Sequence, residues 1–232
     1  MKNGIDISIP FRPDPDATRA WYVEPMQIEP VRMGTWVGSV EAGASVNFNN
    51  LYLNPHAHGT HTECVGHITR EFHSINNCMK KWWFQALVIT IEPERKGNDM
   101  VIEAGQIKKT VGNHIPEALI IRTLPNGEFK KHTNYSHTNP AYMSAGACTW
   151  IRKRGIEHLL IDLPSVDREE DGGKLAAHKA FWNYPDAPRL QATITELIYI
   201  PNDVPDGHYM LNLQVAPIEN DASPSRPVLF TP

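Results

Sequence analysis

Three short apolar runs constrain the fold of this chain more than any other feature. They are QALVITI at residues 85–91, EALIIRT at 117–123 and EHLLIDL at 157–163. Each is a continuous apolar run with aliphatic, partly β-branched residues, which is typical of a buried strand. The chain is therefore expected to build its core around a sheet.

A helix is predicted between the second and the third run. Asn139 and Pro140 resemble an N-cap followed by proline at the first helical position, and the segment AYMSAGACTWIRKR then ends at Gly155 with basic residues in its last turn. Residues 117–163 therefore predict a strand–helix–strand unit, which favours parallel pairing of its strands. Shorter helices are predicted at 104–111 and at 175–182.

The remaining strands are predicted from looser patterns. Residues 5–10, 26–40 with a break at Pro30, and 45–53 alternate, and further strands are expected at 194–201 and 209–217. The nineteen prolines lie largely between the apolar runs, so many short elements joined by turns are expected. No internal repeat or low-complexity linker is apparent, and residues 1–232 are predicted to form a single α/β domain.

Composition and charge exclude several classes of function. The net charge of -4 offers no basic footprint for nucleic acid and no polybasic membrane patch. No apolar run approaches the ~20 residues of a membrane span, and the first residues lack the apolar core of a secretory signal. Cys64, Cys78 and Cys148 are odd in number and scattered, which fits a reducing compartment. A cytoplasmic protein with a small-molecule substrate is expected.

The stretch NPHAHGTHTECVGHIT at 54–69 is the strongest functional signal. It contains four of the eleven histidines, His56, His58, His61 and His67, together with Glu63. Imidazole and carboxylate are ligands for zinc or manganese, and residues two apart in an extended chain point to the same side. The stretch matches neither HExxH nor a zinc-finger pattern. It predicts a metal or catalytic site.

Two other kinds of residue could belong to that site. Glu196 stands in an otherwise apolar strand, and a buried carboxylate is costly unless it is paired or coordinated; the alternative is a glutamate at a strand end facing solvent. Trp21, Trp82 or Trp83 could wall an aromatic substrate, although tryptophan is more often core. Cys64 is expected to be a small buried residue rather than a nucleophile, which would need a base and an orienting group.

In their order along the chain, five segments resemble one family. These are GIDISIPF, HGTHTECVGH, EALIIRT, GIEHLLIDLPSVD and the segment from ELIYIP to the last residues. They resemble the metal-dependent cyclase-like hydrolases, which include bacterial kynurenine formamidase and isatin hydrolase. The resemblance spans nearly the whole chain. It implies a mixed, barrel-like β-sheet core with flanking helices (a swivelling β/β/α fold) and a homodimer or larger homo-oligomer.

The resemblance also implies roles for individual residues. The family's first motif histidine would fall at Ala57, so either His56 enters the site through a one-residue bulge or His58 replaces it; we prefer His56. His67 matches the catalytic proton carrier of the family. The implied ligands of one or two divalent ions, zinc or manganese, are His56, His61, Glu63, His178 and Glu196.

The implied activity is metal-dependent hydrolysis of an amide or a small cyclic amide, formamidase-like, through metal-activated water. The chain departs from the family motif at Ala57, at Glu63 in place of aspartate, and at Cys64-Val65-Gly66 in place of Ala-Pro-x. These departures support an alternative, a non-catalytic family member that serves as a binding or structural protein with a degenerate metal site. A cysteine enzyme using Cys64 is a third reading, distinguished by inactivation through thiol alkylation.

Overall fold

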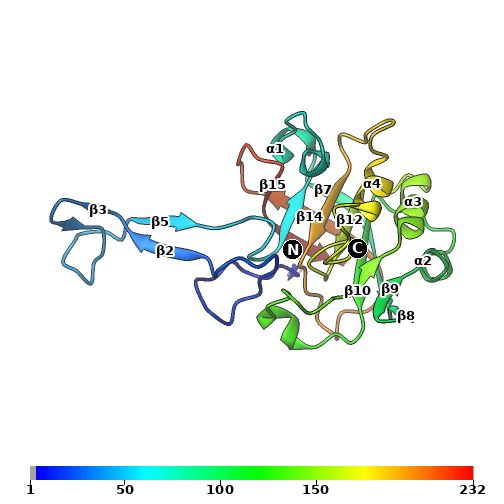
Figure 1. Cartoon of the computed structure of the whole chain (residues 1–232), viewed down its shortest axis with the longest axis horizontal. Coiled ribbons are helices and arrows are strands. Elements are labelled where there is room, and N and C mark those ends of the chain that lie inside the picture. Colours follow the sequence, from blue (N-terminus) through cyan, green and yellow to red (C-terminus); the bar gives the residue numbers. More distant parts are fainter. Residues whose placement is uncertain (1–3, 232) are drawn as a thin grey trace.

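The computed structural model describes residues 4–231, and its core is a closed β-barrel (Figure 1). Within those residues, strands pair around a ring in the order β15–β14–β7–β10–β12–β13–β6, and β6 pairs again with β15. The strands of the ring are β6 (His61–Glu63), β7 (Trp83–Ile91), β10 (Ala118–Thr123), β12 (His158–Ile161), β13 (Thr193–Glu196), β14 (Gly207–Val215) and β15 (Ala222–Phe230). The predicted α/β fold with a barrel-like mixed sheet is confirmed.

One half of the barrel is parallel and the other is antiparallel. β7, β10, β12 and β13 pair in parallel, and β13, β6, β15, β14 and β7 pair antiparallel around the rest of the ring. The helix α3 (Ala145–Lys153) connects β10 to β12, so the strand–helix–strand unit predicted at 117–163 is present. The short strand β1 (Ile5–Asp6) pairs with the outer end of β15.

Alternate residues of the central strands face two different cores. In β10, Ala118 and Ile120 belong to one apolar cluster, together with Leu211 of β14, whereas Leu119 and Ile121 belong to the other. The second cluster contains the buried residues of α2 (Ala104–Val111), α3 and α4 (Ala176–Trp182), which lie together on one side of the barrel (Figure 1). The predicted runs are continuously apolar because both faces of these strands are covered.

Smaller elements complete the body. β8 (Glu94–Lys96), β9 (Asp99–Ile102) and β11 (Tyr142–Met143) form a three-stranded sheet. Three short helical turns lie at η1 (Val65–Ile68), α1 (Ile75–Cys78) and η2 (Glu128–His132). None of the helices within residues 4–231 has the length and apolarity to cross a membrane.

Several predicted boundaries were wrong. The helix expected from Asn139 begins instead at Ala145, where the Ser144 hydroxyl caps it by accepting the Ala147 N–H. Asn139 has a φ of 46° and is followed by the strand β11 rather than by a helix. The strand predicted at 194–201 ends at Glu196, because Leu197 has a φ of 54°. The strand predicted at 5–10 is formed only at Ile5–Asp6. No strand was predicted for β15.

A long β-ribbon leaves the body on one side, and we call residues 26–53 the arm (Figure 1). It consists of β2 (Gln27–Pro30) paired with β5 (Asn49–Tyr52), and of a small outer hairpin of β3 (Arg32–Met33) and β4 (Trp36–Val37). Strands are present in both predicted ranges but are shorter than predicted: 26–40 contains β2, β3 and β4 with an interruption after Pro30, and 45–53 contains only β5. The arm runs directly into the turn that carries His56.

Candidate metal centre

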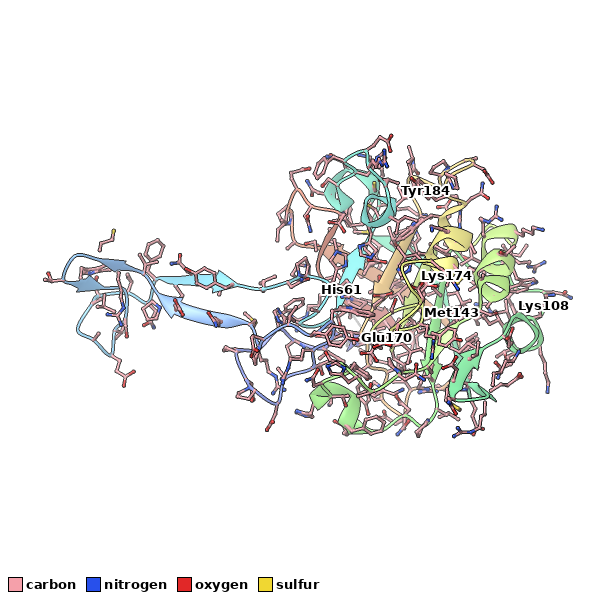
Figure 2. All side chains as sticks on the ribbon, in the orientation of Figure 1. His61, Lys108, Met143, Glu170, Lys174 and Tyr184 are labelled. Atoms are coloured by element: carbon pink, nitrogen blue, oxygen red, sulfur yellow. The ribbon has the colours of Figure 1, made fainter. Side chains whose placement is uncertain are left out.

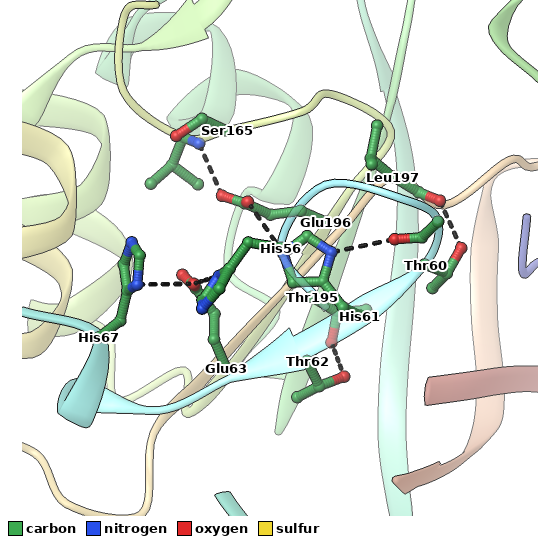
Figure 3. Close-up of polar contacts among 12 residues, drawn as sticks. His56, Thr60, His61, Thr62, Glu63, His67, Ser165, Thr195, Glu196 and Leu197 are labelled. Carbon is green, nitrogen blue, oxygen red and sulfur yellow. Dashed lines mark hydrogen bonds and ion pairs between the residues drawn. The ribbon is translucent and has the colours of Figure 1, made fainter. Parts of the chain in front are cut away.

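β6 and β13 place three of the predicted residues side by side. Their antiparallel register sets Glu196 opposite His61 and Ile194 opposite Glu63. Thr62 and Thr195 point to the opposite face, where their hydroxyls lie 2.8 Å apart. Since Ile194 packs in the cluster that includes α4, the carboxylates and His61 lie on the helix-covered face of the barrel (Figure 3).

The ring of His61 is fixed by the backbone. Its Nδ1 lies 3.0 Å from the Gly59 carbonyl and donates to it, so the lone pair is on Nε2. That Nε2 lies 3.4 Å from Glu196 Oε2. The other Glu196 oxygen accepts the backbone N–H of Val166 at 2.9 Å. His61 is 0% exposed, so its lone pair points into the protein.

His178 reaches the same place from α4. Its Nδ1 contacts Asp167 Oδ2 at 2.6 Å, and its Nε2 lies 3.1 Å from Glu63 Oε1. Asp167 also accepts the backbone N–H groups of Ala177 and His178, so the carboxylate fixes both the start of α4 and the orientation of the ring. A carboxylate behind a histidine is a common support for a metal ligand.

His56, His67 and Asp221 form the outer side of the cluster. His56 Nδ1 lies 3.2 Å from Glu63 Oε2, and its Nε2 lies 2.8 Å from Asp221 Oδ2. His67, on η1, places Nδ1 3.3 Å from Asp221 Oδ2 and 3.8 Å from Glu63 Oε2. Figure 3 shows His56, His61 and His67 turned toward Glu63 and Glu196.

His58 lies outside this cluster. Its Nδ1 accepts the Asn54 backbone N–H at 2.9 Å, and its Nε2 donates to the Glu24 carbonyl at 2.8 Å. Both ring nitrogens are therefore committed to the backbone, where they tie the root of the arm to the turn. Of the two candidates for the first histidine, the structure brings His56 to the site.

Burial and charge act against each other in this cluster. Burial disfavours the charged forms of His56 and His178, but hydrogen bonds outweigh this effect. His56 is hydrogen-bonded to Asp221 and Glu63, and His178 is hydrogen-bonded to Asp167 and Glu63. These hydrogen bonds raise the pKa of each histidine to about 10. Burial likewise opposes the charge of Glu63 and Asp221, yet the neighbouring histidines hold both carboxyl pKa values below their usual range. The cluster therefore stabilises ionised Glu63 and Asp221 beside the positive charge of His56 and His178.

Two buried atoms at the centre of the cluster make close contacts but no hydrogen bond of good geometry among residues 4–231. They are His61 Nε2, 3.4 Å from Glu196 Oε2, and Glu63 Oε2, 3.2 Å from His56 Nδ1. A poorly satisfied buried polar atom is costly, and these two belong to a set of imidazole nitrogens and carboxylate oxygens that lie within 4.8 Å of one another, as in the group His56, His61 and Glu63. This donor set fits a divalent ion such as zinc or manganese.

A cavity of about 370 Å³ opens beside the cluster. Trp21 forms part of its wall, whereas Trp82 and Trp83 are about half exposed and lie elsewhere, so of the three predicted wall residues only Trp21 is at the site. This volume suits a small molecule. The cavity is lined by Trp21, Asn54, His56, His67, Ser165, Asp167, Arg168, Glu169, Asp171, Leu175, His178 and Glu196.

Cys64 does not face the cluster. Its thiol is buried and donates to the His73 carbonyl at 3.3 Å, and it packs in the apolar core on the other face of the sheet. A hydrogen bond with Cys78, together with burial, raises the pKa of the Cys64 thiol far above its usual range. This environment opposes the thiolate that a nucleophile requires.

The sequence analysis missed two carboxylates of the cluster. Asp221 precedes β15, which pairs with β6 so that Ala222 lies opposite Glu63. Asp167 ends the segment GIEHLLIDLPSVD, which was noted only for its resemblance to the family. An acidic residue directly after an apolar strand and a Pro-Ser turn is a signal that could have indicated Asp167; nothing local marks Asp221.

The family model named Cyclase matches residues 5–168. No curated protein sequence matches the chain significantly. A solved structure described as a potential metal-dependent hydrolase with cyclase activity is similar over 99% of this chain and 99% of its own, at 16% identity and a TM-score of 0.70.

Two further solved structures are similar to this chain over nearly their whole length. Isatin hydrolase A from Labrenzia aggregata, bound to benzyl benzoate, covers 99% of this chain and 94% of its own, at 14% identity and a TM-score of 0.69. A predicted metal-dependent hydrolase from Bacillus stearothermophilus covers 98% and 97%, at 16% identity and a TM-score of 0.67. At these identities the similarity establishes the fold.

Proposed function

Because this chain belongs to the Cyclase family, we propose that it is a metal-dependent hydrolase that cleaves an amide or a small cyclic amide. The single observation that supports this most is a pair of buried atoms without a well-formed hydrogen bond, His61 Nε2 and Glu63 Oε2, among further imidazoles and carboxylates. Similar folds include proteins described as metal-dependent hydrolases and isatin hydrolases, and isatin is a small cyclic amide.

The proposed ligands are the residues that meet at the cluster. His61, Glu63, Glu196 and His178 form its buried side, and His56 and Asp221 its more open side. The extra methylene of Glu63, compared with the family's aspartate, extends its carboxylate to His56, His67 and His178. A bound divalent ion would supply a water of lowered pKa and would polarise the substrate carbonyl.

His67 is the proposed proton carrier. Its side chain is 30% exposed, lines the cavity, and sits at the edge of the cluster with Asp221 3.3 Å from Nδ1. A histidine in this place can take a proton from the attacking water and deliver it to the leaving nitrogen, which must be protonated to depart as an amine. Asp221 orients the ring through this contact.

Trp21 and the cavity volume define the proposed substrate class. The indole contributes a flat apolar surface to the lining, and a cavity of about 370 Å³ accommodates one aromatic ring with a short amide substituent. N-aryl formamides and isatin-like lactams combine a planar ring with a hydrolysable amide. We propose these as the first compounds to assay.

The test begins with metal analysis of the protein purified without chelator, followed by assays of hydrolysis of an aryl formamide and of isatin. We expect one or two ions of zinc or manganese per chain and hydrolysis that a chelator abolishes. His61→Ala should lose metal and hydrolysis together, because the buried Nε2 ligand is removed. The matched control is His208→Ala, which changes an exposed histidine outside the cluster.

Two results would count against the proposal. Full hydrolysis by His61→Ala would show that the cluster is not the catalytic centre. Absence of metal even after incubation with zinc and manganese would favour a non-catalytic family member with a degenerate site. His67→Ala separates the roles further, because loss of turnover with metal retained supports a proton carrier, whereas loss of metal makes His67 a ligand.

A further inference from the structure

Left-handed backbone conformations gather around the cavity beside the metal cluster. Seven residues other than glycine have a positive φ among residues 4–231. Five of them either line the cavity or donate a hydrogen bond to Glu169, which lines it: Trp21, Tyr22, His137, Asn139 and Leu175. Such a conformation is disfavoured for residues that carry a side chain, and it persists where the surrounding structure holds it in place.

Glu169 joins three separate segments of the chain at this cavity. One carboxylate oxygen, Oε1, accepts the Tyr22 hydroxyl at 2.9 Å and also the backbone N–H of His137. The other oxygen, Oε2, accepts the backbone N–H of Asn139 at 2.8 Å. All three partners are donors, so a group with two acceptor oxygens satisfies them and an amide does not. The carboxylate therefore fastens the loop after β12 to two other turns of the chain.

Tyr22 is held by polar contacts on its backbone and on its ring. Its backbone N–H donates to the Ser136 hydroxyl at 2.9 Å, and its ring centre lies 4.6 Å from that of His137. The hydroxyl of the same ring reaches Glu169. Because Tyr22 is 51% exposed, burial does little to hold it, and these contacts determine the path of the backbone here.

The path of the backbone at Tyr22 sets the position of Trp21, the residue before it. The indole of Trp21 lines the cavity and also packs against the buried residues Ala20, Tyr135 and Leu197. Trp21 itself has a φ of 60°, so its conformation depends on outside support. Without the contacts of Tyr22 both residues could relax, and the indole would lose its fixed place in the cavity.

Glu169 has little capacity left to bind a substrate directly. Its two oxygens already accept three donors of the protein itself. The guanidinium of the neighbouring Arg168 contacts Asp99 and the Glu170 carbonyl, each at 3.1 Å, rather than Glu169. The carboxylate therefore acts on the cavity through the wall that it holds in place.

We propose that Glu169 is a positioning residue that makes the cavity selective for aryl amides, by holding Trp21 as a fixed flat wall. This role rests on the proposed amide hydrolysis and adds the residue that sets its preference for an aromatic substituent. A wall that is already ordered binds a planar ring without a further entropic cost. An amide without a ring gains nothing from this wall, so loss of Glu169 should weaken aryl substrates selectively.

The test compares two formamides, formanilide with an N-phenyl ring and N-methylformamide without one. In Glu169→Ala the KM for formanilide should rise about tenfold, with kcat within about twofold of wild type, because the wall is disturbed and the reacting centre is not. The kcat/KM for N-methylformamide and the metal content should stay close to those of wild type. Tyr22→Phe removes one of the three donors and should raise the KM for formanilide about threefold.

A double-mutant cycle tests whether Glu169 acts through Trp21. Trp21→Ala removes the wall and should raise the KM for formanilide about as much as Glu169→Ala does. The double variant should be no worse than Trp21→Ala alone, since no indole is left to position. The matched control is Glu170→Ala, which changes the exposed neighbour on the same loop (Figure 2) and should behave as wild type. Thermal unfolding confirms that each variant is folded.

Binding of acetanilide, an aryl amide with acetyl in place of formyl, separates this role from the proposed hydrolysis. Calorimetry measures its Kd, which should rise about tenfold in Glu169→Ala and stay unchanged in Glu170→Ala. A wild type that hydrolyses neither formamide but shows this change would refute the proposed reaction and support the role of Glu169.

Four results would overturn the role of Glu169. They are an unchanged KM and Kd in Glu169→Ala, equal losses for the two formamides, losses that add in the double variant, and a wild type that does not bind acetanilide.

Discussion

A single carboxylate, Asp167, controls the position of His178 in the candidate metal centre. It contacts Nδ1 at 2.6 Å and directs Nε2 toward Glu63. In Asp167→Asn the neutral amide is a weaker acceptor and lowers the basicity of the ring, so metal affinity should fall about 10–100-fold. Competition with a fluorescent chelator measures this change.

Asp171→Asn provides the matched control for that prediction. Asp171 lines the same cavity, but its carboxylate accepts backbone N–H groups of Gly173, Lys174 and Leu175 rather than contacting a histidine. Its metal affinity should stay close to that of wild type. Equal losses in both variants would show that general changes in the cavity, and not the orientation of His178, set the affinity.

His158 makes the stability of the fold depend on pH. It is 4% exposed, its Nδ1 lies 2.9 Å from the Thr193 hydroxyl, and its ring packs on Phe84. Burial, helped by the nearby charge of Lys81, lowers the pKa of His158 from 6.5 to about 4. Between these values the unfolded chain binds the proton and the folded chain does not, so stability falls as the pH drops from 6.5 toward 4.

The size of this effect follows from the two pKa values. Between pH 7.5 and pH 5, His158 should remove about 2 kcal/mol from the free energy of unfolding. His158→Gln keeps a polar group beside Thr193 but does not titrate, so its loss of stability over the same interval should be smaller by about that amount. Urea unfolding at the two pH values checks this, and parallel losses in both proteins would contradict it.

Spacing along the chain identifies residues that share a side of the site only where the backbone is a regular extended strand. His61 and Glu63 were predicted to share a side from their separation of two, and in β6 they do. Asp221 is brought to His56 across 165 residues by the pairing of β15 with β6. No local pattern reports such a pairing, because it depends on the closure of the whole sheet.

At the scale of elements, Ser144 determines where α3 begins. Its hydroxyl accepts the Ala147 N–H at 3.2 Å. Ser144→Ala removes this side-chain acceptor, although the N–H keeps its bond to the Ser144 carbonyl at 2.9 Å. It should lower the free energy of unfolding by about 1 kcal/mol. Urea denaturation measures the loss. Ser225→Ala is the control, because that hydroxyl has no hydrogen-bond partner within residues 4–231, and a similar loss there would remove the capping explanation.

The central strands were predictable and the last strand was not. β7, β10 and β12 are apolar on both faces because helices cover one face and the barrel interior the other, so their burial is visible in composition. β15 contains Pro224 and Pro227, which are normally depleted in strands. The helix start was misplaced because Asn139-Pro140 has the chemistry of a cap, while Asn139 adopts a left-handed turn before β11.

For the whole molecule, the metal centre should contribute to stability. Four carboxylates, from Glu63, Asp167, Glu196 and Asp221, lie close to one another in and around the cluster. An ion bound to the folded chain alone stabilises it by about 3 kcal/mol when present at about a hundred times its Kd, which corresponds to roughly 5–10 °C in Tm for a chain of this size. Chelation should lower Tm by that amount.

Scanning calorimetry with and without chelator measures this shift, and added zinc or manganese should restore it. His61→Ala serves as the control, since a chain that binds little metal should unfold at the same temperature in both conditions. A chelator effect that persists at full size in His61→Ala would place the stabilising ion elsewhere in the molecule.

Because β15 closes the barrel and is the last strand to be made, the candidate metal centre is completed late in the synthesis of the chain. His56 emerges from the ribosome long before Asp221, with 165 residues between them, and at about 5–20 residues per second this delay is roughly 10–30 s. For most of that interval β6 lacks both strand neighbours, because β13 (Thr193–Glu196) and β15 (Ala222–Phe230) are made late. The nascent chain therefore displays His56, His61, Glu63 and His67 before His178, Glu196 and Asp221 exist, so the complete candidate site forms only late in synthesis.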